Sequence, residues 1–273
     1  MQKKINVQIV TLTTDWGLSD YYVGIVKGRL YSLLNDVLIV DITHNIEDYD
    51  LLKTSFIVKN ACMQYPEGTI HIIDVNSYEQ GELSGVKPRP YIVVKHNNQY
   101  YVCTDNGLPS MVFGNDEVEI CDIALYNETD YYTFAALDLF PKVVKMISEN
   151  KSIEHIGNRM SSFCNVVPST QFISQENNSM LLAQVIYVDK YGNVFLNVKD
   201  YEFNKIRKNR SFKIRIGTHH ITNISLSYAD VGIGYPLLTI SSSGYLQLAL
   251  REGSYSSLLS VRIGDNVAIF FGE

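Results

Sequence analysis

Strand-like segments alternate with helical ones along residues 7–75, and this alternation restricts the chain to few folds. Apolar, β-branched runs cover residues 7–13, 36–43 and 68–75, and apolar residues spaced by three and four cover 21–34 and 50–65. Strands that are apolar throughout and separated by helices are typical of a parallel sheet covered on both faces. We therefore expect an α/β N-terminal domain with a mostly parallel sheet.

Two further elements are predicted in this half of the chain. Asn97 and Asn98 lie between two strand-like runs and predict a hairpin turn. A helical segment follows later, with Pro141 in its first turn.

The second half has a different pattern. Residues 150–180 are rich in Asn, Ser and Gln without a period, which is typical of a linker. Short strand-like runs follow, separated by Gly and Asn turns, and this pattern is typical of an antiparallel barrel or sandwich. We predict two domains, residues 1–165 and residues 166–273.

Composition excludes several classes of protein. The chain has 273 residues, of which 46% are hydrophobic, and can bury a sizeable core. Its formal net charge of -6 shows no basic excess, so a nucleic-acid partner is not expected. The four cysteines form no C-x-x-C pair, and no apolar run suits a signal peptide or a membrane span. We expect a cytoplasmic protein with reduced thiols and no membrane partner.

The strand-like segments of the first half end in polar residues. Asp15 follows the first segment, His44 the second, and Asp74 lies at the end of the third. Ligands of open α/β sheets bind beyond the carboxyl ends of the strands. No G-x-G-x-x-G follows the first segment, which disfavours a dinucleotide, whereas a carboxylate there can accept two hydrogen bonds from the cis-diol of a ribose.

Structural roles stay open for the same residues. Asp15 or Asp20 could cap the helix that follows them, and His44 could be a histidine satisfied within a turn. A metal site is not expected, because no paired histidines or paired acids have the spacing of ligands.

Seven motifs, taken in order and spacing, resemble those of one enzyme family. They are TLTTDWGLSDYYVGIVKG, IVDITHNI, YPEGTIHIIDV, CTDNGL, VDKYGN, YADV and SSSGYLQLAL. The family is the S-adenosylmethionine hydroxide adenosyltransferases, which are adenosine-forming S-adenosylmethionine hydrolases related to fluorinase and chlorinase. The resemblance covers nearly the whole chain. It implies an all-β C-terminal antiparallel barrel, and a homotrimer whose sites lie between the N-terminal domain of one subunit and the C-terminal domain of the next.

The resemblance also implies roles for individual residues. Asp74 and Arg89 are the implied catalytic residues that order the attacking water, and Asp15 is the implied holder of the ribose hydroxyls. The resemblance implies S-adenosylmethionine as the substrate, and no cofactor or metal is expected. The implied substrate-binding residues are Asp15, Asp20, Tyr21, Tyr22, Tyr49, Phe134, Asp189, Asn193, Ser242, Ser243, Tyr245, Leu250, Arg251 and Glu252.

The chain departs from the family pattern in three places. Residues 75–90 lack the glycine-rich turn of the hydrolases, Ala135 and Ala136 stand where they carry a histidine and a glycine, and Arg251 stands where the family usually has asparagine. Tyr78, Glu79 and Glu82 of the longer loop are candidates to replace the histidine.

Three functions stay open. The first is a hydrolase in which water or hydroxide attacks the ribose 5′ carbon to give adenosine and L-methionine. The alternative is a nucleoside or S-adenosylmethionine binding protein without turnover, and the third is a trimeric scaffold. Halogenation is disfavoured, because Ala136 replaces the serine that fluorinase uses.

Overall fold

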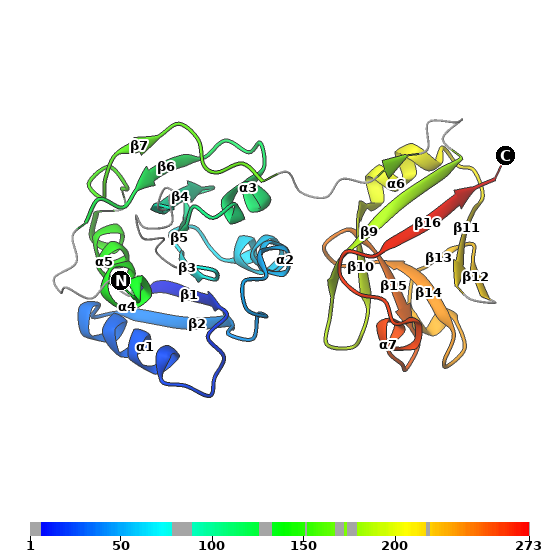
Figure 1. Ribbon diagram of the computed structural model, residues 1–273, viewed down its shortest axis with the longest axis horizontal. Coiled ribbons are helices and arrows are strands. Elements are labelled where there is room, and N and C mark those ends of the chain that lie inside the picture. The colour runs from blue at the N-terminus through cyan, green and yellow to red at the C-terminus, as the bar shows by residue number, and fades with distance from the viewer. Residues whose placement is uncertain are drawn as a thin grey trace, which may run out of the picture. The chain divides into compact units, whose positions relative to one another are not determined.

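A computed structural model describes residues 7–77, 89–125, 133–150, 152–166, 172–173, 179–216 and 219–272. The chain divides into two compact units, Met1–Val167 and Pro168–Glu273 (Figure 1). The expected boundary, after residue 165, lies close to this division. Among the helices of these ranges, none combines the length and the apolar character that crossing a membrane would require.

Strands and helices alternate at the start of the first unit. Its elements are β1 (Gln8–Thr14), α1 (Tyr22–Leu33), β2 (Val37–Thr43), α2 (Leu51–Ala61), η1 (Cys62–Gln64), β3 (Ile70–Asp74), β4 (Tyr91–His96), β5 (Gln99–Thr104), α3 (Leu108–Phe113), β6 (Glu119–Asp122), α4 (Ala135–Asp138), α5 (Phe140–Asn150) and β7 (Arg159–Met160). Asn97 and Asn98 join β4 to β5 with positive φ angles of 48° and 58°, as the two-residue hairpin turn requires. The predicted hairpin and the helix that begins near Pro141 are confirmed.

The seven-stranded sheet of this unit is mixed rather than mostly parallel. Its order is β2-β1-β3-β5-β4-β6-β7. The pairings from β2 to β5 are parallel, whereas β4, β6 and β7 form antiparallel pairs. The prediction is therefore correct for one half of the sheet and wrong for the other. A two-residue turn can join only antiparallel strands, so the hairpin reverses the direction of the chain.

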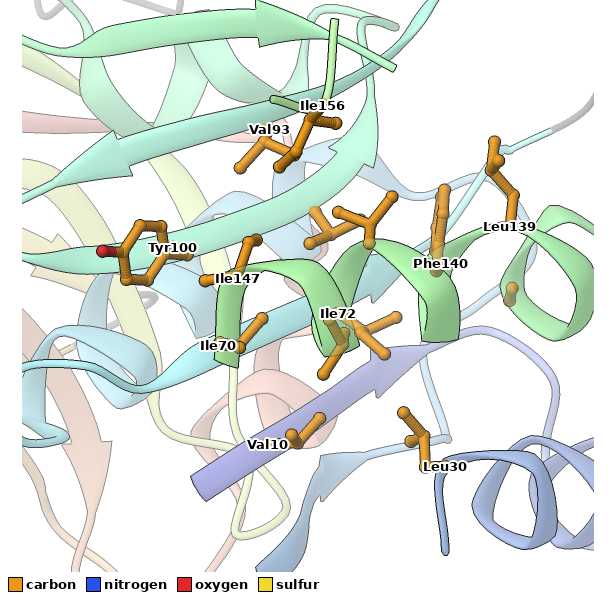
Figure 2. Close-up of a cluster of buried hydrophobic side chains, with 14 of the residues drawn as sticks. Val10, Leu30, Ile70, Ile72, Val93, Tyr100, Leu139, Phe140, Ile147 and Ile156 are labelled. Atoms are coloured by element: carbon orange, nitrogen blue, oxygen red, sulfur yellow. The ribbon is translucent and has the colours of Figure 1, made fainter. Parts of the chain in front are cut away.

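Helices cover both faces of this sheet. On one face α1, α4 and α5 bury side chains such as Leu30, Phe140 and Ile147, which Figure 2 shows gathered over the strands. On the other face, α2 and α3 bury Val58 and Val112. The chain passes from β1 through α1 to β2 on one side, and then through α2 to β3 on the other side of β1. The connections therefore diverge beyond the carboxyl ends of β1 and β3, which is where open α/β sheets bind ligands.

The second unit is built on one nine-stranded sheet that is largely antiparallel. Its elements are β8 (Phe172–Ile173), β9 (Met180–Val188), β10 (Val194–Lys199), α6 (Asp200–Arg207), β11 (Phe212–Ile216), β12 (His219–Ile221), β13 (Ile224–Ser225), η3 (Tyr228–Asp230), β14 (Pro236–Ile240), β15 (Tyr245–Leu250), α7 (Tyr255–Leu259) and β16 (Asn266–Phe271). The path runs β12-β11-β16-β9-β10-β15-β14-β13, and β8 pairs with β9. The sheet curls so that β12 comes close to β14. A closed barrel stays a prediction, because within the described ranges no ladder joins β12 to β13 or β14.

Two short helices correct the expectation of an all-β second domain. In α6 only Phe203 is buried, and it packs edge-on against Phe212 with ring centroids 5.3 Å apart. The carboxylate of Glu202 accepts the backbone N–H of Lys199 at 2.9 Å and so closes the first turn. A helix that buries a single side chain has no apolar period, which is why the sequence pattern does not predict it.

Two glycines provide a matched pair of tests of this fold. Gly28 lies inside α1, and an added methyl group would meet nothing within 4 Å. At Gly157 the same methyl group would collide with the backbone carbonyl of Asp122 and the backbone N–H of Ala124. We expect Gly28→Ala to raise the free energy of unfolding by about 0.5–1 kcal/mol. We expect Gly157→Ala to lower it by about 1–3 kcal/mol in chemical denaturation. Equal effects of both substitutions would contradict the described packing.

Candidate functional site

A cavity of about 600 Å³ lies at the carboxyl ends of β1 and β3. It is lined by Asp15, Trp16, Tyr22, Asp48, Tyr49, Asp74, Asn76, Ser77, Thr133 and Phe134. The described lining holds three carboxyl groups and four aromatic rings, and no lysine, arginine or histidine. Five residues that the sequence nominates, from four separate segments, therefore meet in one place: Asp15, Tyr22, Tyr49, Asp74 and Phe134.

Asp15 connects the turn after β1 to the loops after β2 and β3. Its Oδ2 accepts the backbone N–H of Tyr49 at 3.4 Å and that of Asn76 at 3.3 Å. Both donors have positive φ angles, 66° for Tyr49 and 52° for Asn76. The N-cap position of α1 is occupied by Tyr21, without a side-chain hydrogen bond to the cap. The capping role considered for Asp15 or Asp20 is therefore wrong.

Asp74 is a buried carboxyl group at the end of β3, with 6% of the residue exposed. Burial raises the pKa of Asp74 to about 7, against hydrogen bonds from Ser77 and Trp16 that lower it, and the nearby charge of Asp15 raises it further. The indole Nε1–H of Trp16 donates to Asp74 Oδ2 at 2.9 Å. A carboxyl group with a pKa near neutrality can act as a general base, since it exchanges a proton at physiological pH.

His44 contacts Trp16, which is a residue of the cavity wall. It is buried, with Nδ1 at 2.7 Å from Thr14 Oγ1 and Nε2 at 3.1 Å from Asp41 Oδ1. Its ring stacks on Trp16 with centroids 6.1 Å apart, and its carbonyl accepts the backbone N–H of Gly17 at 2.8 Å. His44 is not among the described residues that line the cavity. These contacts favour the structural role for this histidine.

The second implied catalytic residue, Arg89, is not among the described residues of the cavity wall. The charge of Arg89 acts on Asp105. Burial raises the pKa of Asp105, whereas the hydrogen bond from the backbone N–H of Cys164 and the charge of Arg89 lower it. The carboxylate of Asp105 accepts that N–H at 2.8 Å and 3.0 Å. Asp105 and Arg89 therefore belong to the region where residues near 164 attach to the end of β5.

The remaining N-terminal candidates lie at or near the cavity rim. Asp20 is exposed, and the exposed ring of Tyr21 stacks on Tyr22 at 4.7 Å. Ala135 begins α4 and packs against the core, so its methyl group offers no proton acceptor. The loop candidates Tyr78, Glu79 and Glu82 lie outside the described residues.

The second unit has its own cavity, of about 730 Å³. It is lined by Tyr191, Asn193, Ser227, Tyr228, Ala229, Leu250, Arg251, Glu252 and Gly253. Asn193, Leu250, Arg251 and Glu252 were nominated from the sequence. The guanidinium of Arg251, which stands where the family usually has asparagine, donates to the carbonyl of Val231 at 2.7 Å.

Other candidates of the second unit have different surroundings. Asp189 closes the turn between β9 and β10, because its carboxylate accepts the backbone N–H groups of Tyr191 and Asn193, both at 2.9 Å. Ser242, Ser243 and Tyr245 lie at the start of β15, and Leu250 lies at its end. Five strand steps correspond to roughly 16 Å, so these two groups occupy opposite ends of one strand.

Sequence reasoning missed Trp16, Asp48, Ser77 and Thr133 in the first cavity. Trp16 could have been found, because it is the single tryptophan of the chain and directly follows Asp15. Asn76 and Ser77 become lining residues only through the turn after β3. In the ranges that the structure describes, no group of three or more His, Cys, Asp or Glu side chains is arranged to hold a metal ion.

Comparison with known proteins gives matches to both units. Residues 10–157 match the profile of the SAM hydroxide adenosyltransferase N-terminal domain, and residues 183–268 match that of the C-terminal domain, where SAM is S-adenosylmethionine. An (R)-S-adenosyl-L-methionine hydrolase of Methanocaldococcus jannaschii is 26% identical over 278 residues, covering 97% of each chain. A fluorinase of Nocardia brasiliensis is 22% identical, also covering 97% of each chain. The crystal structure of an uncharacterized conserved protein from Thermotoga maritima has a TM-score of 0.83 and 28% identity, covering 96% of this chain and 100% of that one.

Burial of Asp74 predicts a pH-dependent stability. Its pKa is about 7 in the folded protein and has the ordinary value of 3.8 in the unfolded chain, so between these values the folded state binds more protons. The free energy of unfolding should therefore fall as the pH rises from about 4 to about 7. His71 acts oppositely, because burial lowers its pKa to about 3.

The difference between wild type and Asp74→Asn removes the contribution of His71, which both proteins share. In urea denaturation, wild type should lose stability relative to Asp74→Asn over this pH window. A constant difference between the two proteins would contradict the described environment of Asp74.

Proposed function

The chain belongs to the SAM hydroxide adenosyltransferase family, and from this premise we propose that it is an S-adenosylmethionine hydrolase that forms adenosine and L-methionine. The curated relatives named (R)-S-adenosyl-L-methionine hydrolase support this activity. The observation that carries the proposal is the charge of the first cavity, whose described lining has three carboxyl groups and no cationic side chain.

This lining suits a sulfonium substrate. S-adenosylmethionine carries a fixed positive charge on sulfur, next to the carbon at which the reaction occurs. Carboxylates attract such a cation, and the faces of aromatic rings such as Trp16 and Phe134 attract it as well. A halide anion would be repelled by the same carboxylates, so this lining favours neutral water over a halide as the nucleophile.

The reaction requires alignment more than activation of the leaving group. The oxygen of water forms a bond to the ribose 5′ carbon while the bond from this carbon to sulfur breaks, and its electron pair stays on sulfur in neutral methionine. One proton leaves the water oxygen. Asp74 is the described group able to accept it, because its pKa of about 7 leaves it partly ionised at neutral pH.

Asp15 is proposed to hold the ribose. A carboxylate can accept hydrogen bonds from both hydroxyls of a cis-diol, and Asp15 lies in the cavity wall next to Asp74. In this arrangement the sugar is fixed by Asp15, and its 5′ carbon faces the carboxyl group that receives the proton. Holding the reacting atoms in line provides a large share of the rate enhancement.

We further propose the assembly that the family resemblance implies, a homotrimer in which the C-terminal domain of a neighbouring subunit completes each site. Exposed aromatic side chains surround both cavities and support this assembly: Tyr21 and Tyr49 are 66% and 64% exposed, and Tyr191 and Tyr228 are 75% and 43% exposed. Tyrosine is enriched at protein interfaces, where its ring is buried by the partner.

Incubation of the purified protein with S-adenosylmethionine tests the activity. Adenosine and methionine should form, and the rate should rise with pH through an apparent pKa near 7 as Asp74 ionises. Asp74→Asn should lower the rate by about 10²–10⁴-fold, since it removes the proton acceptor. Asp36→Asn makes the same chemical change at an exposed site before β2 and should have no effect.

If S-adenosylmethionine binds but yields no adenosine, the hydrolase proposal fails. The protein is then the binding protein without turnover, an outcome for which the methyl group of Ala135 in place of the family histidine provides a reason. Absence of both S-adenosylmethionine binding and turnover would leave the trimeric scaffold as the remaining function.

Asp15→Asn tests the placement of the ribose. Asparagine keeps an oxygen that can accept the N–H groups of Tyr49 and Asn76, so the melting temperature should stay close to wild type. Loss of the charged acceptor should weaken adenosine binding by about 1.5–3 kcal/mol, which is roughly tenfold to a hundredfold in calorimetry. Unchanged affinity with an unchanged melting temperature would show that Asp15 only joins the two loops.

A further inference from the structure

We propose that Trp16 is the positioning residue of Asp74, and that its indole N–H orients this carboxyl group in place of a cationic side chain. The proposal rests on the proposed function, in which Asp74 receives the proton. It concerns a residue that neither the sequence patterns nor the family motifs had singled out for a role.

Strand pairing brings the two residues together. β1 and β3 run parallel, and Thr14 pairs with Asp74 in their register. Trp16 lies two residues beyond Thr14, so the turn after β1 passes directly beside Asp74. The resulting hydrogen bond, from Trp16 Nε1–H to Asp74 Oδ2, is 2.9 Å long.

The orientation of the indole is fixed on two sides. The ring of His44 stacks against it with an angle of 19° between the planes, and the ring of Phe134 meets it edge-on with centroids 5.2 Å apart. His44 is in turn held by its contacts with Thr14 and Asp41. A donor fixed in this way loses little freedom when it bonds the carboxylate.

The indole donor to Asp74 is neutral, and this matters because of the charged groups around Asp74. Asp15 faces it from the turn after β1, and Asp48 lines the same cavity from the loop before α2. Ser77 bonds it from its own loop, and the described lining has no cationic side chain. A guanidinium or ammonium group at this place would lower the pKa of a carboxyl group by 1–3 units, roughly, and weaken it as a base. An indole N–H fixes the carboxylate without adding a charge, so Asp74 can keep a pKa near neutrality.

Fluorescence provides a test that needs no substrate. Trp16 is the single tryptophan of the chain, so emission excited at the red edge of its absorption comes from this side chain alone. Ionisation of a carboxyl group bonded to the indole should change that emission. We expect a transition near pH 7 in wild type and none in Asp74→Asn. Constant emission from about pH 5 to about pH 9 in wild type would overturn the proposal. A transition that persists in Asp74→Asn would also overturn it, because a group other than Asp74 would then cause the change in emission.

Trp16→Phe tests the effect on Asp74 itself. Phenylalanine keeps a ring between His44 and Phe134 but has no donor. The apparent pKa of Asp74, measured from the pH dependence of stability relative to Asp74→Asn, should rise by about one unit. If turnover is observed, kcat should fall about tenfold with little change in KM, and the pH profile should shift by the same amount.

A purely structural tryptophan would give a different result. Trp16→Phe would then lower the stability equally at every pH and would leave the pKa of Asp74 unchanged, which overturns the proposal. The stability and fluorescence measurements do not depend on turnover. A protein that passes both tests but releases no adenosine would contradict the proposed function and leave the contact between Trp16 and Asp74 intact.

Discussion

The parallel pairing of β1 with β3 is the constraint on which the site depends. Because Thr14 lies opposite Asp74, the two strands end at the same level and direct their following residues into the same cavity. The crossover through α1 and the return through α2 cover opposite faces of the sheet, and the cavity lies at the carboxyl ends of the two strands between these connections. Core packing such as that of Phe140 against the strands keeps this edge of the sheet in place (Figure 2). The cavity is thus a consequence of topology, and its chemistry depends on which side chains stand at the strand ends.

The charges of the cavity lining distinguish this site. Three carboxyl groups share a cavity in which no described lining residue carries a positive charge, and one of them, Asp74, is nearly buried. Burying a carboxyl group without a cationic partner raises its pKa, and the resulting loss of stability grows as the pH rises from the ordinary pKa to the raised one. The same cost favours a positively charged ligand, because a sulfonium supplies the charge that the protein lacks. A group of this kind is destabilising in the free protein and useful in the complex, as is common at functional sites.

The accuracy of sequence reasoning differed between elements for physical reasons. The first three strands and two helices were predictable, because each has a strong apolar period of its own. The mixed sheet was not, since the direction of β6 and β7 depends on pairing with β4, far from any local pattern. Arg89 was nominated by its place in the sequence, yet its charge acts on Asp105, because a side chain's partner depends on how the loop folds. The hydrogen bonds of Asp189 are local instead, because they lie within the turn that contains Asn193.

The sequence by itself determined the polar residues at the strand ends, the alternation that makes the first unit α/β, and the family motifs that identify the chain. These are local properties, because a strand's apolar run and a turn's composition can be seen within ten or so residues. Only the tertiary structure decided that Trp16 is the donor to Asp74, and that His44 supports the indole instead of lining the cavity. It alone also decided how far the pKa of Asp74 departs from its ordinary value. Each of these depends on burial and on distances between segments far apart in the chain, which no single stretch of sequence contains.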